Sequence, residues 1–177
     1  RRLPWLCVNL LTACLAGAVV GVYGVTIEKF VILAVFLPII ASQGGNAGMQ
    51  TVTVIVRDMA LGELSPGDGR KALFKELLLG LLIGTIIGLI VGVVGYLIAP
   101  EFGIPVDISW ILGLVVGTAM VLNLLAAALF GVLIPFALKF FRLDPALGSS
   151  ILITTVTDVA GFFFLLALAK WILVSEA

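Results

Sequence analysis

The chain has 177 residues, of which 62% are apolar and 11% are charged, and its ten basic residues balance its ten acidic ones. Its mean hydropathy is +1.31, whereas globular domains are about 45–50% apolar and about 25% charged. The composition excludes a soluble globular protein and predicts an integral membrane protein in a lipid bilayer. The net charge of zero averages over both sides of the membrane, and it indicates no nucleic-acid partner.

The apolar runs predict an all-α fold of five transmembrane helices in one domain that covers residues 1–177. A helix needs about 20 apolar residues to cross the hydrocarbon core of a bilayer. Charged and turn-forming residues separate the runs, most clearly before residue 73. We expect helices over residues 5–25, 30–56, 73–99, 108–141 and 145–174.

Basic residues are unequally shared between the two sides that five helices define. Only Lys29 and Lys170 fall on the side away from the amino terminus. Basic loops stay in the cytoplasm, so we expect a multi-pass protein of the plasma or inner cell membrane. Its amino terminus would be cytoplasmic and its carboxyl terminus external. The chain starts at Arg1 rather than Met, and we expect a fragment of a longer protein.

Asp158 is the residue around which the functional prediction is built. Most of the ten acidic residues lie at or outside the ends of apolar runs, but Asp158 lies inside the last run. An ionisable group at that depth costs about 2.5–3.5 kcal/mol on insertion scales and is by default a functional-site hypothesis. A neutral carboxylic acid that bonds a neighbouring helix remains the alternative.

A polar stripe accompanies Asp158 along the same helix. Ser150, Thr154 and Asp158 recur every four residues, with Thr157 beside them. Residues at this spacing share one face of a helix. We expect that face to line a pore, with Asp158, Thr154, Ser150 and Thr157 as residues of its metal site.

Residues 38–53 form a second polar segment within an apolar run. Pro38 removes a backbone hydrogen bond, and the glycines that follow allow either close helix contact or unwinding. Asn46, an amide in this segment, is the fifth predicted residue of the metal site. Polar backbone at membrane depth is tolerated where protein buries it or where it lines a watery cavity. A glycine-rich crossing point and an ion pathway are therefore both open, and the density of oxygen-bearing side chains favours the pathway.

Other features of the sequence predict contacts between helices and the start of a helix. Glycines at four-residue intervals from Gly80 to Gly92 predict a close helix contact. Asn123 is an isolated amide that could bond a neighbouring helix or contact an ion. Asp144 followed by Pro145 fits a helix N-cap and first turn.

The ligand types available favour a hard cation. The chain has no histidine and two cysteines, Cys7 and Cys14. On a helix these lie about 10 Å apart, beyond disulfide range. Carboxylate, amide and hydroxyl oxygens suit Mg²⁺ or another divalent cation. One carboxylate balances a divalent ion poorly, so we expect a symmetric homodimer in which two Asp158 side chains hold a largely hydrated Mg²⁺ in a central pore.

The chain resembles the transmembrane domain of the MgtE family of magnesium channels. The resemblance rests on PIIASQGGNAGMQ at residues 38–50, Lys75-Glu76, Asn123, Pro135, DPAL from residue 144, and TTVTDVAG at residues 154–161. It implies a homodimer of five-helix subunits, with a pore lined by the second and fifth helices. The family's pore aspartate corresponds to Asp158.

Two departures from the family pattern accompany this resemblance. Ser150 stands where the family has an asparagine, which places the selectivity for Mg²⁺ over larger ions in question. Most members also carry a cytosolic magnesium-sensing region ahead of the first helix. No such regulatory region is found within these residues, and we expect either a fragment or a minimal member.

Two other classes of function are alternatives to a channel. An ion-coupled secondary transporter of a small solute would also show a broken helix and a buried acid, but the two halves show no convincing repeat. A membrane-embedded enzyme needs a nucleophile with a base, paired acids or a bound metal. The lack of histidine and the single buried carboxylate disfavour an enzyme.

Overall fold

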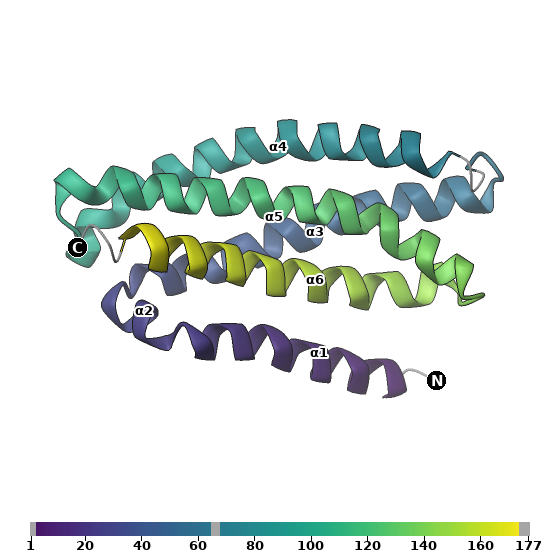
Figure 1. Ribbon diagram of the computed structural model, residues 1–177, viewed down its shortest axis with the longest axis horizontal. Coiled ribbons are helices and arrows are strands. Elements are labelled where there is room, and N and C mark those ends of the chain that lie inside the picture. Colours follow the sequence, from purple (N-terminus) through teal and green to yellow (C-terminus); the bar gives the residue numbers. More distant parts are fainter. Residues whose placement is uncertain (1–2, 65–67, 174–177) are drawn as a thin grey trace.

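The computed structural model describes residues 3–64 and 68–173, and these are helical apart from short connections. The predicted all-α fold is confirmed for these ranges. The described residues form six α-helices, whose arrangement Figure 1 shows. They are α1 (Leu3–Val22), α2 (Gly24–Lys29), α3 (Ile32–Ala60), α4 (Gly69–Ile98), α5 (Val106–Phe140) and α6 (Pro145–Leu168). A 3₁₀ turn, η1 (Ala99–Phe102), follows α4, and a π-helical turn, η2 (Ala169–Leu173), follows α6.

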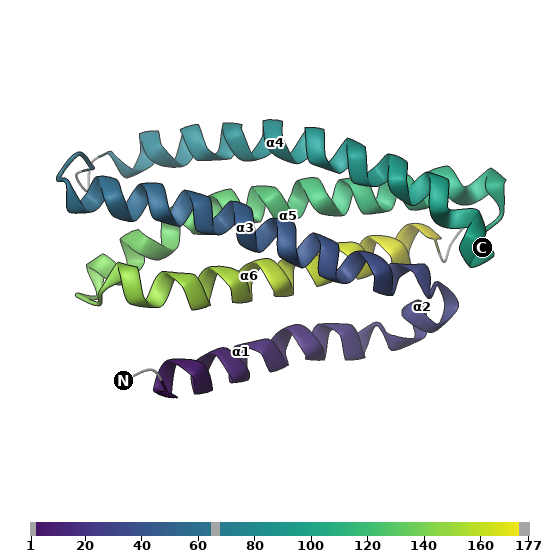
Figure 2. The same ribbon diagram turned by 180° about the vertical axis from the view of Figure 1, so that it is seen from behind.

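The long helices run alternately up and down, side by side (Figures 1 and 2). Helix α5 is central and packs against α3, α4 and α6. Helix α6 also packs against α3, and α1 lies at the edge of the bundle against α6. The main apolar core lies where α3, α5 and α6 meet and includes Phe36, Ile40, Leu112, Met120 and Leu165.

Four stretches are long and apolar enough to cross a membrane. They are Ile32–Ala60, Gly69–Phe102, Val106–Phe140 and Gly148–Leu173, while the apolar part of the first helix, Cys7–Val22, is shorter. The second to fourth predicted spans therefore match α3 to α5 to within four residues at each end, and the fifth begins at Pro145, as α6 does. Residue 174, the predicted end of the fifth span, lies outside the described residues.

The first predicted span ends earlier than expected. Helix α1 stops at Val22, and Tyr23 has φ −101° and ψ 16°, outside the helical region, before the short α2 begins at Gly24. The apolar run continues past this point, so hydropathy alone did not reveal the break. The chain uses α2 to turn back towards α3 (Figure 2).

Helix α3 is continuous through residues 38–53, where the sequence allowed either an intact or an unwound helix. Pro38 lies in its second turn, and the helix runs on without interruption to Ala60. Its glycines instead allow side chains of α5 and α6 to pack closely against α3. A Cβ atom on Gly44 would collide with the Asn123 side chain, and one on Gly48 would lie 2.5 Å from Ile153 Cγ1.

The glycine ladder of α4 packs against α5, as predicted. A Cβ on Gly88 would lie 2.7 Å from the Gly117 carbonyl oxygen, and one on Gly117 would lie 2.8 Å from that of Gly88. Gly92 and Gly113 form a second reciprocal pair, with corresponding distances of 2.8 Å and 2.6 Å. The two backbones meet directly over this stretch, which we call the glycine seam.

Most basic residues of the described chain lie at one end of the helix bundle. The end of α3, the start of α4 and the end of α5 lie together at one end of the bundle (Figure 1). These segments and the turn after α5 carry Arg57, Arg70, Lys71, Lys75, Lys139 and Arg142. Lys29, at the end of α2, and Lys170, in η2, lie at the opposite end.

Candidate cation site

The start of α6 is set by local chemistry that the sequence predicted. Asp144 precedes the helix, and its Oδ1 accepts a hydrogen bond of 2.9 Å from the Ala146 backbone N–H. Pro145 occupies the first turn, where a missing N–H is harmless. This cap fixes where α6 begins, and Asp158 follows almost four turns later.

Asp158 and Thr154 of α6 share one cavity with Asn46 of α3. The cavity has a volume of about 250 Å³, and its other walls are Ala41, Ser42, Gly45 and Met49 of α3. Asp158 is half-buried, whereas Asn46 is exposed. The structure therefore brings together three of the five predicted site residues, from segments more than a hundred residues apart in sequence.

Ser150 and Thr157 do not line this cavity. Ser150 is half-buried two turns before Asp158. Thr157 is fully buried, and its hydroxyl donates to the carbonyl oxygens of Ile153 and Thr154, each at 3.0 Å. It faces Gly45 of α3, whose added Cβ would lie 3.8 Å from Thr157 Oγ1.

The Thr154 hydroxyl is oriented by its own helix. It donates to the carbonyl oxygens of Ser150 at 3.0 Å and Ile151 at 3.1 Å. Because the proton points towards the helix backbone, the oxygen lone pairs remain free to accept. An accepting hydroxyl beside a carboxylate suits the protons of water molecules around a cation.

A polar face of α3 continues from the cavity. Gln43, Asn46, Gln50 and Thr53 line an open groove of about 660 Å³ together with Met49 and Val54. These four polar residues are exposed. They follow helical spacing on the side opposite Gly44, Gly48 and Thr51, which are buried. Within the described residues, nothing covers this polar face.

Asn123 contacts a neighbouring helix. It is fully buried, and its Nδ2 donates a hydrogen bond of 2.9 Å to the Ile40 carbonyl oxygen of α3. Its side chain fits against Gly44 of α3 and Gly161 of α6, where a Cβ would collide with it. Its Oδ1 has no hydrogen-bond partner among the described residues. Asn123 thus joins three helices behind the cavity.

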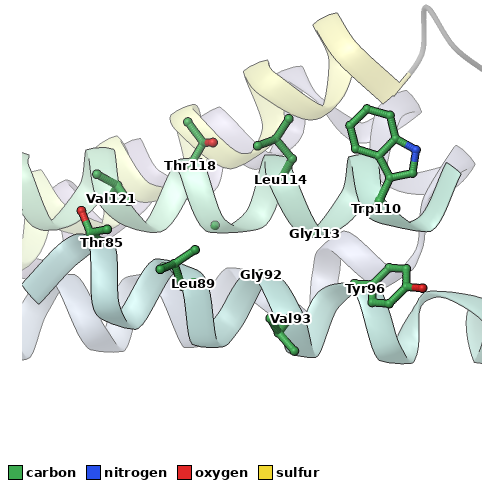
Figure 3. A pocket seen from close by; sticks show the side chains of 12 residues that line it. Thr85, Leu89, Gly92, Val93, Tyr96, Trp110, Gly113, Leu114, Thr118 and Val121 are labelled. Carbon is green, nitrogen blue, oxygen red and sulfur yellow. The ribbon is translucent and has the colours of Figure 1, made fainter.

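The apolar groove between α4 and α5 is a separate feature (Figure 3). It measures about 630 Å³ and lies over the glycine seam, with Trp110 and Tyr96 at one end. Its polar groups are the hydroxyls of Thr85, Thr118 and Tyr96 and the Trp110 indole, and no carboxylate lines it. It therefore lacks a charged ligand for a cation.

A single copy of the chain supplies a sparse set of metal ligands. Among the described residues, no group of three or more carboxylate, cysteine or histidine side chains could hold a metal ion. The cavity offers one carboxylate, one amide and two hydroxyls. Such a set suits an ion that keeps its water shell, since Mg²⁺ is usually held by one or two carboxylates and several waters.

Comparison with known proteins assigns the chain to a family. The profile of the MgtE family, described as a divalent cation transporter, matches residues 37–168. The chain belongs to the MgtE family. The match covers α3 to α6 almost completely, including every residue of the cavity.

Curated relatives of the family align over nearly the whole chain. The magnesium transporter MgtE of Thermus thermophilus is 34% identical over 172 residues, which are 97% of this chain and 36% of that protein. The protein of the same name from Bacillus subtilis is 28% identical, over 96% of this chain and 36% of its own length. The magnesium transporter MgtE of Enterococcus faecalis is 32% identical over 159 residues, which are 90% of this chain and 33% of that protein. The chain therefore spans about a third of the length of these relatives.

The structure adds contacts that the sequence did not suggest. Gly45 lies against Thr154 and Thr157, and the Thr51 hydroxyl donates a hydrogen bond of 3.0 Å to Glu76 Oε2. Thr51 carried a signal, because it falls on the glycine-bearing side of α3. Glu76 was part of the family resemblance, but nothing in the sequence indicated its contact with Thr51.

Proposed function

We propose that this protein conducts divalent cations, with Mg²⁺ as the principal substrate, across the membrane through a pore formed by two copies of the chain. The observation that carries the proposal is the cavity in which Asp158 and Thr154 of α6 meet Asn46 of α3. Membership of the MgtE family supports it independently.

A hydrated ion fits the chemistry of the cavity. Water occupies about 30 Å³ per molecule in the liquid, so about 250 Å³ leaves room for several waters around an ion. The Asp158 carboxylate would accept hydrogen bonds from those waters, as would the outward lone pairs of Thr154. Facing Asp158 side chains from two subunits would balance the charge of a divalent ion. Ser150, two turns towards the basic end, would contact the ion's waters further along the pathway.

The uncovered polar face of α3 supports a homodimer. Gln43, Asn46, Gln50 and Thr53 lie in the middle and inner half of a helix long enough to span the bilayer. Polar side chains facing lipid would be costly at that depth. A twofold-related copy of the same face would enclose them and the water-filled pathway.

Five spanning helices per subunit agree with the alternating directions of α1, α3, α4, α5 and α6. Helix α1 has 20 residues, and a helix of that length is about 30 Å long, the thickness of the hydrocarbon core. The basic end of the bundle would face the cytoplasm, with the amino terminus on that side.

The decisive test is cation flux into proteoliposomes that contain the purified protein, with Mg²⁺, Ca²⁺, Mn²⁺ and Co²⁺ compared. Asp158→Asn removes the charge and keeps the shape, so Mg²⁺ flux should be lost while the dimer persists. Asp144→Asn is the matched control. Asparagine is an equally good N-cap, and Asp144 lies at the start of α6, outside the cavity.

Two outcomes would refute the proposal. Full Mg²⁺ flux in the Asp158→Asn protein would remove the paired carboxylates from the mechanism. Absence of flux of all four cations through a folded wild-type dimer would favour a transporter of another solute.

A further inference from the structure

Helix α3 has two opposed faces with different tasks. Ser42, Gln43, Asn46, Gln50 and Thr53 are exposed on one side, whereas Ile40, Gly44, Gly48, Thr51 and Ile55 are buried on the other. The rotation of α3 about its own axis therefore decides whether Asn46 faces the cavity. Any group that fixes the buried face also fixes the polar one.

Two side-chain hydrogen bonds hold the buried face. Asn123 of α5 donates to the Ile40 carbonyl oxygen at 2.9 Å, and Thr51 donates to Glu76 of α4 at 3.0 Å. Ile40 and Thr51 are eleven residues apart, which is about three helical turns, so both lie on the same side of α3. Asn46 lies between these two points along the helix.

The environment of Thr51 makes it sensitive to rotation. Thr51 is buried, and a Cβ on Gly131 of α5 would lie 2.8 Å from both Thr51 Cβ and Thr51 Cγ2. Its methyl group thus rests on α5 while its hydroxyl reaches α4. Gln50, the next residue back along the helix, lies on the polar face.

Glu76 lines a cavity between α3 and α4. The cavity measures about 280 Å³, and residues of α5, Leu124 and Ala128, form its floor. Helix α4 packs along α5 through the glycine seam. The Thr51–Glu76 hydrogen bond therefore bridges α4 to α3 across a gap that the backbones do not close.

We propose that Glu76 is a positioning residue of the ion pathway, which holds Thr51 and so keeps the inner half of α3 in the rotation that presents Asn46 and Gln50 to the pore. The inference rests on the proposed cation pathway. Glu76 itself lies outside the cavity of Asp158.

A rival role for Glu76 is simple attraction of cations by its charge, and two substitutions separate the roles. Glu76→Gln removes the charge but keeps an oxygen that can accept from Thr51. Thr51→Val keeps the charge and the shape but removes the donor. Positioning requires that the first substitution is tolerated and the second is not, whereas attraction requires the reverse.

The experiment measures Mg²⁺ and Co²⁺ flux per folded dimer in proteoliposomes for wild type, Thr51→Val, Glu76→Ala, Glu76→Gln and the double variant Thr51→Val/Glu76→Ala. Thr51→Val and Glu76→Ala should each lower Mg²⁺ flux about threefold to tenfold, the range of hydrogen bonds between membrane helices. The double variant should be no worse than the more impaired single variant, because both remove one interaction. Glu76→Gln should retain most of the flux, and the Mg²⁺-to-Co²⁺ ratio should change in the impaired variants.

Thr85→Val is the matched control, because the Thr85 hydroxyl donates only within its own helix, to the Leu81 carbonyl oxygen at 2.8 Å. It should conduct as wild type does. The inference is overturned if Thr51→Val leaves flux and ion ratio unchanged, or if Glu76→Gln is as impaired as Glu76→Ala. A wild-type protein that conducts neither cation would instead refute the proposed function.

Discussion

Replacement of glycine by alanine should have different effects in the glycine seam and on α1. In Gly88→Ala the new Cβ would lie 2.7 Å from the Gly117 carbonyl oxygen and 2.9 Å from Val121 Cγ2. Ordinary contact begins near 3.4 Å. Helix α4 would therefore have to move away from α5 by several tenths of an ångström. In Gly21→Ala the new Cβ on α1 would meet no atom within 4 Å.

The expected free energies follow from these distances. Overpacking lowers the free energy of unfolding by about 1–3 kcal/mol. Replacing glycine by alanine within a helix raises it by about 0.5–1 kcal/mol. Gly88→Ala should therefore destabilise the protein by about 1–2 kcal/mol. Gly21→Ala should leave the free energy of unfolding unchanged or raise it by up to about 1 kcal/mol.

Thermal unfolding of the purified protein in detergent, followed by tryptophan fluorescence, measures both variants. At about 2–4 °C per kcal/mol for a chain of this size, Gly88→Ala should lower Tm by about 2–8 °C. Gly21→Ala should hold Tm or raise it. Equal shifts in the two variants, or a Gly88→Ala protein as stable as wild type, would refute direct backbone contact at the seam.

Two further predictions concern the other contacts. Gly44→Ala should lower Tm because its Cβ collides with Asn123, and adding Asn123→Ala should recover part of the loss; strictly additive shifts in the double variant would contradict this. Asn46→Ala should weaken Mg²⁺ flux in proteoliposomes less than Asp158→Asn does, since an amide contributes less than a charge. Unchanged flux in that variant would return Asn46 to a packing role.

The sequence predicted the features that depend on local spacing. The apolar runs indicated the long helices, the four-residue glycine interval indicated the contact of α4 with another helix, and Asp144 with Pro145 indicated the start of α6. Thr154 and Asp158 share a helix face by the same spacing and share a cavity in the structure. These features need only the geometry of a single helix.

The sequence could not predict features set by helix rotation or by distant contacts. Thr157 is one residue from Asp158, and the step of about 100° between them takes its side chain into the buried interface. The break at Tyr23 depends on how α2 turns towards α3 rather than on hydropathy. The bond between Thr51 and Glu76 joins residues 25 positions apart on different helices, and no sequence pattern announces it.

The seam has a mechanical consequence as well. Interlocking side chains resist sliding of one helix along another, because each ridge must climb out of its groove. The reciprocal pairs Gly88/Gly117 and Gly92/Gly113 present smooth backbone instead. Along the seam, side chains therefore do little to hold the axial position of α4 on α5. The short η1 connection joins α4 to α5 at one end, and the hydrogen bond from Thr51 to Glu76 ties the other end of α4 to α3.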